Sequence, residues 1–472
     1  MQRHFSRRQL LRDSAALALG LSGLRTLVSR LSIEGLVPQE GPPGYGPLIA
    51  DPRGVLNLPK GFSYSVFSKT GERMDDGLYV PAAHDGMAAF PGPDGLTLLV
   101  RNHEAPAALP RYGPFGWSNE LFASFDRRRM YDAGYGRTPC AGGTTTLVYD
   151  TRSQTLKRHS LSLAGTAVNC AGGPTPWGSW ITCEETEQQA DGTYEKSHGY
   201  NFEVPASAEI ALAEPIPLIA MGRFKHEAVA VHPPTGIIYQ TEDQHEGLIY
   251  RFIPAVPGEL RQGGRLQALM VRDRPGLDTR NWPGDDESVA QPTIFPGESH
   301  AVRWIDLEEI DSPKNDLRLR GRAAGAACFA RGEGMWLGRD GVYFACTNGG
   351  PKMLGQIWKY TPSPVEGTPE ENDQPGRLEL FIESDDKSLL ENCDNLTVAP
   401  WGDLVIAEDS PGTDRLLGIT PEGVCYEVAK CVLNDSEMAG PCFSPDGSTL
   451  FVNIQTPGLT LAITGPWGRR ID

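Results

Sequence analysis

The sequence has no Cys-x-x-Cys pair and, beyond roughly its first thirty residues, few apolar patterns of helical period. The missing cysteine pairs argue against a zinc ribbon or a thioredoxin-type redox site. Nine cysteines are present, an odd number, so at least one is unpaired or has another role. The scarcity of helical patterns, together with 54 glycines and 39 prolines in 472 residues, favours short strands joined by many turns. We therefore predict an all-β protein.

The chain also lacks the positive charge that binding to nucleic acid requires. Its formal net charge is -17, whereas a non-specific nucleic-acid binder needs a cationic surface to displace phosphate counterions. There is no Gly-x-Ser-x-Gly elbow, no Walker loop, and no Gly-x-Gly-x-x-Gly followed by a helix. The α/β-hydrolase, nucleotide-hydrolase and Rossmann folds therefore have no support. The acidic excess serves either solubility or the binding of metal ions.

No stretch is long and apolar enough to span a bilayer as a mature helix. The apolar run from Ala15 to Leu21 is too short, and it follows the basic segment SRRQLL at residues 6–11. This arrangement resembles a twin-arginine export signal, although a basic amphipathic helix is an alternative. We expect residues 1–34 to be the signal segment and residues 45–472 to form a single domain. The expected destination is the periplasm or the medium, reached through the twin-arginine export machinery, with no stable membrane span after processing.

An internal repeat organises the rest of the chain. Each copy has a strand-like segment, a turn containing glycine, and a second segment rich in β-branched and aromatic residues. The turn glycines, each suited to a positive φ, are Gly95, Gly178, Gly236, Gly341, Gly402 and Gly447. Six hairpins at irregular spacing predict a six-bladed β-propeller with long inter-strand insertions rather than a sandwich or a barrel. The alternative is six unrelated hairpins with solvated tips.

In a hairpin, the start of the first strand lies beside the end of the second. The repeats therefore pair Asp85 with Asn102 to Glu104, Cys170 with Cys183 to Glu185, Glu227 with Glu242 and Asp243, Glu333 with Thr347 and Asn348, Asp394 with Glu408 and Asp409, and Gly440 with Asn453. Because the innermost strands of a propeller line its channel, we expect the polar ends to converge in one funnel.

A cluster of about seven carboxylates would repel unless cations neutralised it. Oxygen-rich sets suit hard cations, above all Ca²⁺, and the acidic residues at the strand ends include Glu184, Glu185, Glu242, Asp243, Glu408 and Asp409. A thiolate such as that of Cys170 suits a softer or redox-active metal. The pattern therefore predicts a mixed site. Cys183 falls where other copies have packing residues, so we expect it to be structural.

Basic residues accompany two of the expected ligands. Arg331 lies two residues before Glu333, and Arg223 and Lys225 precede Glu227. Arginine suits bidentate contact with phosphate, and a one-residue gap in a strand returns Arg331 to the face of Glu333. For Arg223 and Lys225, a surface salt bridge is an equally good interpretation.

Six segments together resemble the PhoX alkaline phosphatase family. They are VRNHE (100–104), GGTTTLVYD (142–150), NCAGGPTPWGSWITCEE (169–185), GRFKHEAV (222–229), FARGEGM (329–335) and DNLTVAPWGDLVIAED (394–409). The resemblance extends from about residue 50 to the C-terminus, and the motif around Cys170 is highly specific. The sequence departs from the family at Gly332, where an Arg-Pro-Glu motif is expected, and this departure leaves a monoester, diester or nucleotide substrate open.

The resemblance implies a six-bladed propeller that hydrolyses phosphate monoesters at a cluster of two ferric ions (Fe³⁺) and calcium ions (Ca²⁺). It implies that Cys170 bridges the irons and that Glu227 and Glu333 are further iron ligands. Glu184, Glu185, Asp394 and Asp409 would serve mainly calcium. Arg331 would bind the phosphate ester substrate, and Asn102 is expected with it among the catalytic residues. The metals would polarise the P–O bond and supply an activated nucleophile.

Two other functions fit the same pattern. A calcium-only propeller hydrolase, such as a lactonase, phosphotriesterase or phosphodiesterase, would use the carboxylates and leave Cys170 idle. A non-catalytic propeller would bind a partner on its rim. Metal content distinguishes the two hydrolases.

Overall fold

The computed structural model describes residues 43–105, 109, 112–283 and 292–468, which belong to one compact unit. The predicted signal segment, residues 1–34, lies outside the described residues. Within the described ranges, no helix has the length and apolar character needed to cross a membrane.

Each sequence repeat forms an antiparallel hairpin. The hairpins are β4 (His84–Pro91) with β5 (Thr97–His103), β8 (Asn169–Pro174) with β9 (Ser179–Glu184), β11 (His226–His232) with β12 (Ile237–Glu242), β16 (Gly332–Leu337) with β17 (Val342–Cys346), β20 (Cys393–Val398) with β21 (Leu404–Glu408), and β24 (Met438–Phe443) with β25 (Thr449–Ile454). Five of the six turn glycines have positive φ, as predicted. The expectation is wrong at Gly341, where an added Cβ would instead lie 2.7 Å from the carbonyl oxygen of Tyr360. There the glycine permits close approach of a neighbouring strand.

Further strands extend the hairpins outward into antiparallel sheets. These strands are β6 (Gly142–Asp150), β7 (Thr155–Thr166), β10 (Asn201–Pro205), β13 (Ile249–Pro254), β14 (Gly264–Val271), β15 (Ser299–Asp306), β18 (Gln356–Thr361), β19 (Arg377–Glu383), β22 (Arg415–Ile419), β23 (Cys425–Cys431) and β26 (Leu459–Thr464). The sheets that begin at β11 and at β16 join through pairing of β15 with β19. In the described part of the chain, the one α-helix is α2 (Leu317–Ala323).

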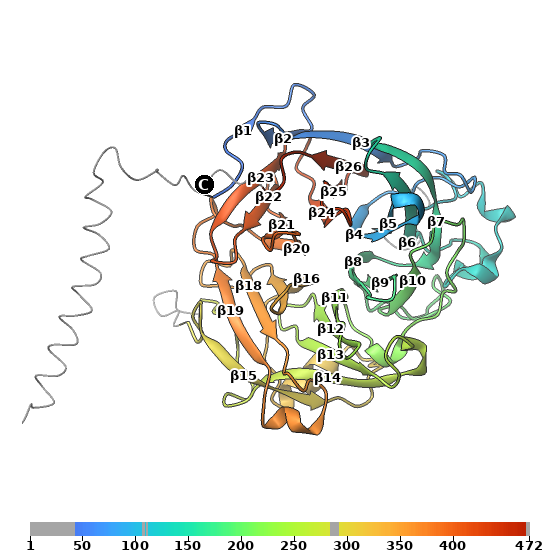
Figure 1. Ribbon diagram of the computed structural model, residues 1–472. Coiled ribbons are helices and arrows are strands. Elements are labelled where there is room, and N and C mark those ends of the chain that lie inside the picture. The colour runs from blue at the N-terminus through green and yellow to red at the C-terminus, as the bar shows by residue number, and fades with distance from the viewer. Residues whose placement is uncertain (1–42, 106–108, 110–111, 284–291, 469–472) are drawn as a thin grey trace, which may run out of the picture. The chain divides into compact units, whose positions relative to one another are not determined.

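The hairpins surround a central axis (Figure 1). Their first strands contact one another in the order β4, β8, β11, β16, β20 and β24, and β24 contacts β4. Strands β1 (Leu48–Ile49), β2 (Leu56–Pro59) and β3 (Ser63–Lys69) precede the first hairpin, and β3 pairs with β26. The early and late parts of the described chain therefore complete one sheet together. This arrangement confirms the predicted all-β propeller, with the repeats supplying its inner strands.

The hydrophobic core lies between adjacent sheets. Met87 and Leu99 of the first hairpin pack with Phe451 of the last, and Ile181 packs in one cluster with Val229 of the next hairpin. Because both faces of these inner sheets are covered, their strands are apolar along most of their length. Polar side chains of the inner strands gather mainly toward the strand ends, and this placement positions the site.

Candidate metal centre

A register shift interrupts all six inner hairpins at the same place. The shifts fall between His84 and Met87, Asn169 and Gly172, His226 and Val229, Gly332 and Met335, Cys393 and Leu396, and Ala439 and Cys442. An extra residue in one strand bends it and turns a side chain away from the ladder. Five of these irregular steps contain a predicted strand-end residue with a metal-binding side chain, namely Asp85, Cys170, Glu227, Glu333 and Asp394. The bulges thus aim these side chains toward the axis.

The side chains meet in a cavity of about 180 Å³. Its lining consists of Asp85, Glu104, Cys170, Glu185, Glu227, Asp243, Arg331, Glu333, Thr347, Asp394, Asn395, Asp409 and Glu437. We call this cavity the funnel. The structure therefore brings together Cys170, Glu185, Glu227, Glu333, Asp394, Asp409 and Arg331, all of them predicted site residues. A larger cavity of about 430 Å³ contains a single carboxylate, Asp76, so volume alone does not locate the chemistry.

Second strands contribute to the funnel through the residue that directly follows each of them. Glu104 follows β5, Glu185 follows β9, Asp243 follows β12, and Asp409 follows β21. The sixth hairpin has Gln455 at this place, and its amide nitrogen donates to Asp85 (3.0 Å) and Glu104 (2.6 Å). The funnel is thus built mainly from two positions in each of the first five repeats.

Three groups of potential metal ligands lie within the funnel. They are Cys170 with Glu185 and Glu227, Glu227 with Glu333 and Asp394, and Asp85 with Glu104 and Glu437. In each group the ligand atoms lie within 4.8 Å of one another. Glu227 belongs to two groups, which places one carboxylate between two neighbouring sites. The third group offers only oxygen, the donor that calcium prefers.

The funnel carboxylates are too close and too buried to be ionised together without cations. Burial raises the pKa of Glu227 and Glu333 well above the usual range, and neighbouring carboxylates raise it further. The same causes raise the pKa of Asp394 to about 7 and that of Glu437 to about 10. Bound cations would reverse these shifts because they favour the charged form. The donor set therefore fits metal ions.

Cys170 is held at the wall of the funnel. Its side chain is buried, and its sulfur lies 3.3 Å from the carbonyl oxygen of His226 and 3.6 Å from that of Glu227. Burial, followed by the charges of Glu227 and Glu185, raises the thiol pKa well above its usual value. A metal ion would deprotonate the thiol outright. Cys183 does not line the funnel, and it packs in the apolar core with Ile181.

Arg331 supplies positive charge at the funnel. Its guanidinium donates to both carboxylate oxygens of Asp243, at 2.7 and 3.0 Å, and lies 3.1 Å from Glu333. Burial alone would raise the pKa of Asp243, but the hydrogen bonds and charge of Arg331 lower it below the usual value. The backbone of Arg331 has a φ of 50°, a left-handed conformation that is uncommon for residues other than glycine. Lys225 adds a second cation, 3.3 Å from Glu185.

Gly332 follows Arg331 in the inner strand. It pairs with Cys346, and an added Cβ would meet the Cβ of Thr241 at 3.3 Å. The position is tight, so the strand is restrained there by its neighbours.

Glu184, a predicted calcium ligand, does not line the funnel. Its side chain is fully buried on the other side of β9, where it accepts hydrogen bonds from the backbone nitrogens of Ala167, Gly199 and Tyr200 and lies 2.7 Å from His198 Nδ1. Successive residues of a strand point to opposite faces, so Glu184 and Glu185 cannot both face the axis. The structure therefore places Glu184 outside the funnel, apart from the other predicted calcium ligands.

Asn102, predicted to be catalytic, does not line the funnel, and its side-chain hydrogen bonds are internal. Its amide nitrogen donates to the carbonyl oxygens of Cys170 (3.1 Å) and Ala171 (2.7 Å). Its oxygen accepts from Trp180 Nε1 and Thr182 Oγ1, both at 2.8 Å. The side chain is fully buried and positions the bulge that carries Cys170.

Sequence reasoning missed Glu437. The sequence pattern pairs Asn453 with Gly440, but in the structure Asn453 pairs with Ala439. Ala439 therefore takes the ligand position of the sixth hairpin, and Glu437 lies two residues earlier, immediately before β24. The two-residue offset keeps Glu437 on the same face of the strand as Ala439, and this spacing was the sequence signal that could have identified it.

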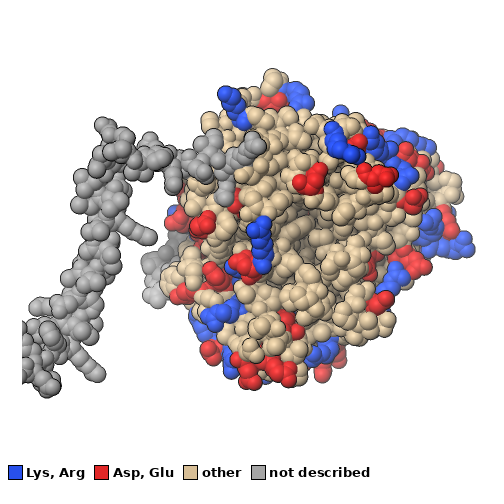
Figure 2. Space-filling view, viewed as in Figure 1, with Lys and Arg blue, Asp and Glu red and all other residues tan. Residues whose placement is uncertain are grey.

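Figure 2 shows one face of the propeller, hollowed near the centre and with charged side chains mainly toward its periphery. Much of the acidic excess is thus ordinary surface charge.

Comparison with known proteins identifies relatives of this fold. The structure of Pseudomonas fluorescens PhoX in complex with vanadate, a transition state analogue, is similar with a TM-score of 0.64 and 18% sequence identity, over 90% of this chain and 97% of that chain. A gluconolactonase from Xanthomonas campestris has a TM-score of 0.36 and 10% identity, over 90% of this chain and 99% of that chain. Virginiamycin B lyase from Staphylococcus aureus has a TM-score of 0.38 and 10% identity, over 85% of this chain and 99% of that chain. No curated protein sequence matches this chain significantly.

The sequence was also compared with models of whole protein families, and one family matches. The family described as alkaline phosphatase PhoX matches residues 43–113 and 116–458, which is most of the chain. Together with the shared propeller fold, this match shows that the chain belongs to the PhoX alkaline phosphatase family.

Proposed function

We propose that this protein hydrolyses phosphate monoesters at a mixed iron–calcium centre in the funnel, after export through the twin-arginine route. One observation carries the proposal: a thiol, nine carboxylates and a guanidinium line a single cavity. Nine carboxylates with a single arginine cannot be neutralised internally. The carboxylates supply sites for hard cations, and the thiol adds a soft ligand that calcium alone would not use.

The donor groups suggest how the ions would be distributed. Cys170, Glu227 and Glu333 would hold ferric iron, and Glu227 would serve two neighbouring groups of ligands. Glu185, Asp394 and Asp409 would serve mainly calcium. Asp85, Glu104 and Glu437 add an oxygen-only group. When bound, the ions would polarise the phosphoryl oxygens and activate the attacking water.

The protein's own cations would orient the substrate. Arg331 would donate to the phosphoryl group through Nη1, since Nε and Nη2 are already hydrogen-bonded to Asp243. In the structure Asp243 holds the guanidinium from one side, and this contact restricts its rotation. Lys225, beside Glu185, would add charge for an anionic substrate. This geometry favours a substrate with a terminal phosphate group.

Metal analysis of natively exported protein, combined with hydrolysis of p-nitrophenyl phosphate, tests the proposal. We expect iron and calcium in the pure protein, and hydrolysis when calcium is present. Cys170→Ser should lose iron and activity, while Cys183→Ser, a change in the adjacent apolar core, should keep both. Protein with calcium, no iron and no phosphatase activity would instead support the calcium-only hydrolase. Protein that binds no metal and hydrolyses nothing would support the binding propeller.

A further inference from the structure

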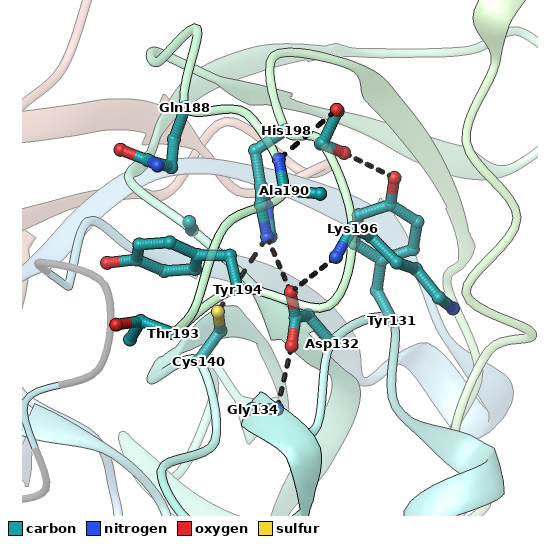
Figure 3. A network of polar contacts seen from close by, with 12 residues as sticks. Tyr131, Asp132, Gly134, Cys140, Gln188, Ala190, Thr193, Tyr194, Lys196 and His198 are labelled. Carbon is teal, nitrogen blue, oxygen red and sulfur yellow. Dashed lines mark hydrogen bonds and ion pairs between the residues drawn. The ribbon is translucent and has the colours of Figure 1, made fainter.

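A further group of metal-ligating side chains lies outside the funnel, and we call it the second group to distinguish it from the funnel as a whole. Asp132, Cys140 and His198 bring a carboxylate oxygen, a thiol and an imidazole nitrogen within 4.8 Å of one another. Their exposed fractions are 0%, 1% and 0%. Figure 3 shows the three side chains converging between two loops. Burying such groups is costly unless they are paired or bind a metal ion, and here the imidazole is the shared neighbour of the carboxylate and the thiol.

The loops that carry these residues are long insertions between strands. Asp132 and Cys140 precede β6, and His198 precedes β10. Asp132 accepts hydrogen bonds from the backbone nitrogens of Gly134 (2.7 Å) and Lys196 (3.1 Å). The backbone nitrogen of Cys140 donates to the carbonyl oxygen of Asp132. The rings of Tyr131 and Tyr194 contact the imidazole edge to face (Figure 3).

Glu184 fixes the orientation of the histidine. Its carboxylate lies 2.7 Å from His198 Nδ1 and is itself anchored by three backbone nitrogens. With Nδ1–H donated to Glu184, Nε2 faces Asp132 and Cys140. A carboxylate behind the imidazole is the usual support of a metal-binding histidine. Glu184, which does not line the funnel, thus supports the histidine of the second group.

The distances from His198 Nε2 can be compared with those expected for an ion pair and for a metal site. His198 Nε2 lies 3.3 Å from Asp132 Oδ2 and 3.7 Å from Cys140 Sγ. A charged N–H···O bond contracts to about 2.7–2.9 Å. Around a tetrahedral zinc ion, ordinary bond lengths place a nitrogen and an oxygen about 3.4 Å apart and a nitrogen and a sulfur about 3.6 Å apart. The observed separations match the edges of such a tetrahedron.

We propose that Asp132 Oδ2, Cys140 Sγ and His198 Nε2 bind a zinc-class divalent ion, with water in the fourth position. The ion would tie the two insertions together. It would also connect to the funnel, because Glu184 directly precedes the funnel residue Glu185. The role is therefore structural, with an influence on the position of a funnel carboxylate.

The metal content of substituted proteins tests this site separately from the funnel. Natively exported protein is expected to contain one zinc-class ion per chain besides its other metals. Cys140→Ser is expected to lose that ion, and its other metal content should not change. Cys442→Ser is the matched control, since it removes a buried thiol from the core between hairpins. Unchanged zinc in Cys140→Ser, or no such ion in the wild type, overturns the proposal and leaves a buried ion pair.

X-ray absorption at the zinc edge covers the case in which Cys140→Ser does not fold. The measurement uses Cys170→Ser, which removes the funnel thiol and leaves the second group intact. We expect one sulfur neighbour at about 2.3 Å, with nitrogen and oxygen neighbours at about 2.0–2.2 Å. A zinc ion surrounded only by nitrogen and oxygen in this protein contradicts the assignment.

Discussion

At the scale of residues, neighbouring carboxylates at the strand ends have separate roles. Glu185 and Asp409 face the funnel, whereas the preceding Glu184 and Glu408 point back into the sheets. Glu408 there accepts two hydrogen bonds from Arg415, one from Nε and one from Nη2, each at 2.7 Å. Because alternate residues of a strand face opposite ways, one acidic residue can anchor the strand end while the next is free to bind a metal ion.

Asn102 offers a test of how far a residue outside the funnel controls it. Asn102→Ala leaves the indole of Trp180 and two carbonyl oxygens of the Cys170 bulge without partners in a buried place. We expect a loss of about 2–5 kcal/mol in the free energy of unfolding, measured with urea, and a lower iron content. Asn372→Ala removes an exposed hydrogen bond and should change stability by less than about 0.5 kcal/mol. Equal stabilities of the two variants would contradict the positioning role.

Arg331→Lys tests phosphate binding. Lysine keeps the charge but loses both the two-pronged contact with Asp243 and the Nη1 donor, so we expect kcat/KM for p-nitrophenyl phosphate to fall by about 10–100-fold, corresponding to about 1.5–3 kcal/mol. Inhibition by inorganic phosphate should weaken in parallel, while iron and calcium content stay constant. Arg339→Lys changes an exposed arginine and should leave kcat/KM unchanged. If Arg331→Lys kept the inhibition constant for phosphate, the arginine would not contact the phosphoryl group.

The residue pattern shows what the sequence could and could not predict. The spacing of Asp85, Cys170, Glu227, Glu333 and Asp394 within six repeats was enough to place them together. Side chains alternate between the two faces of a strand, and a bulge interrupts this alternation. A single sequence does not show where the bulge lies, so it does not show which of two neighbouring acidic residues faces the axis. The second group, formed by Asp132, Cys140 and His198, could not be predicted, since it joins two irregular loops whose contact no periodicity reveals.

At the scale of elements, the second strand of one hairpin holds the bulge of a neighbouring one. Asn102 of β5 contacts the carbonyl of Cys170 in β8. Thr241 Oγ1 of β12 donates to the carbonyl of Glu333 in β16 at 2.7 Å. Asn453 of β25 donates in the same way to the carbonyl of Asp85 in β4. Each ligand-bearing bulge in these three places is therefore held by the adjacent repeat, so the shape of the funnel depends on contacts between repeats.

Gly334 tests the close contact between inner strands. A Cβ at this position would lie 2.7 Å from both the carbonyl oxygen of Asp394 and the nitrogen of Leu396. Because backbone cannot move aside cheaply, Gly334→Ala should reduce the free energy of unfolding by about 1–3 kcal/mol and lower metal content. Gly192→Ala, with open space around the added methyl group, should be neutral. Circular dichroism melts and metal analysis of both variants make the comparison, and a stable, fully loaded Gly334→Ala protein would show that the strands can separate.

At the scale of the whole molecule, the funnel joins every repeat at the centre while the outer strands join the early and late parts of the described chain. Pairing of β3 with β26 closes one sheet at the periphery, as in Tyr64 opposite Ile463. At the axis, however, the repeats present like charges to one another. Without cations, repulsion among the funnel carboxylates opposes closure of the ring of repeats. Bound cations would neutralise these charges and favour closure. Metal binding should therefore contribute to the stability of the entire ring.

The pH dependence of stability follows from this conflict. A carboxyl group whose pKa is higher in the folded than in the unfolded state binds more protons when folded, so folding becomes less favourable as pH rises between the two values. For Glu437 the interval runs from 4.5 to about 10, and for Asp394 from 3.8 to about 7. Metal-free protein should therefore melt at progressively lower temperature from about pH 5 to about pH 9, whereas metal-loaded protein should lose less, because cations replace the protons. Calorimetry of both forms across this range measures the effect. A metal-free protein whose stability rises with pH over the whole interval would mean that the funnel carboxylates are ionised in the folded chain without cations, and the electrostatic basis for a metal centre would then be lost.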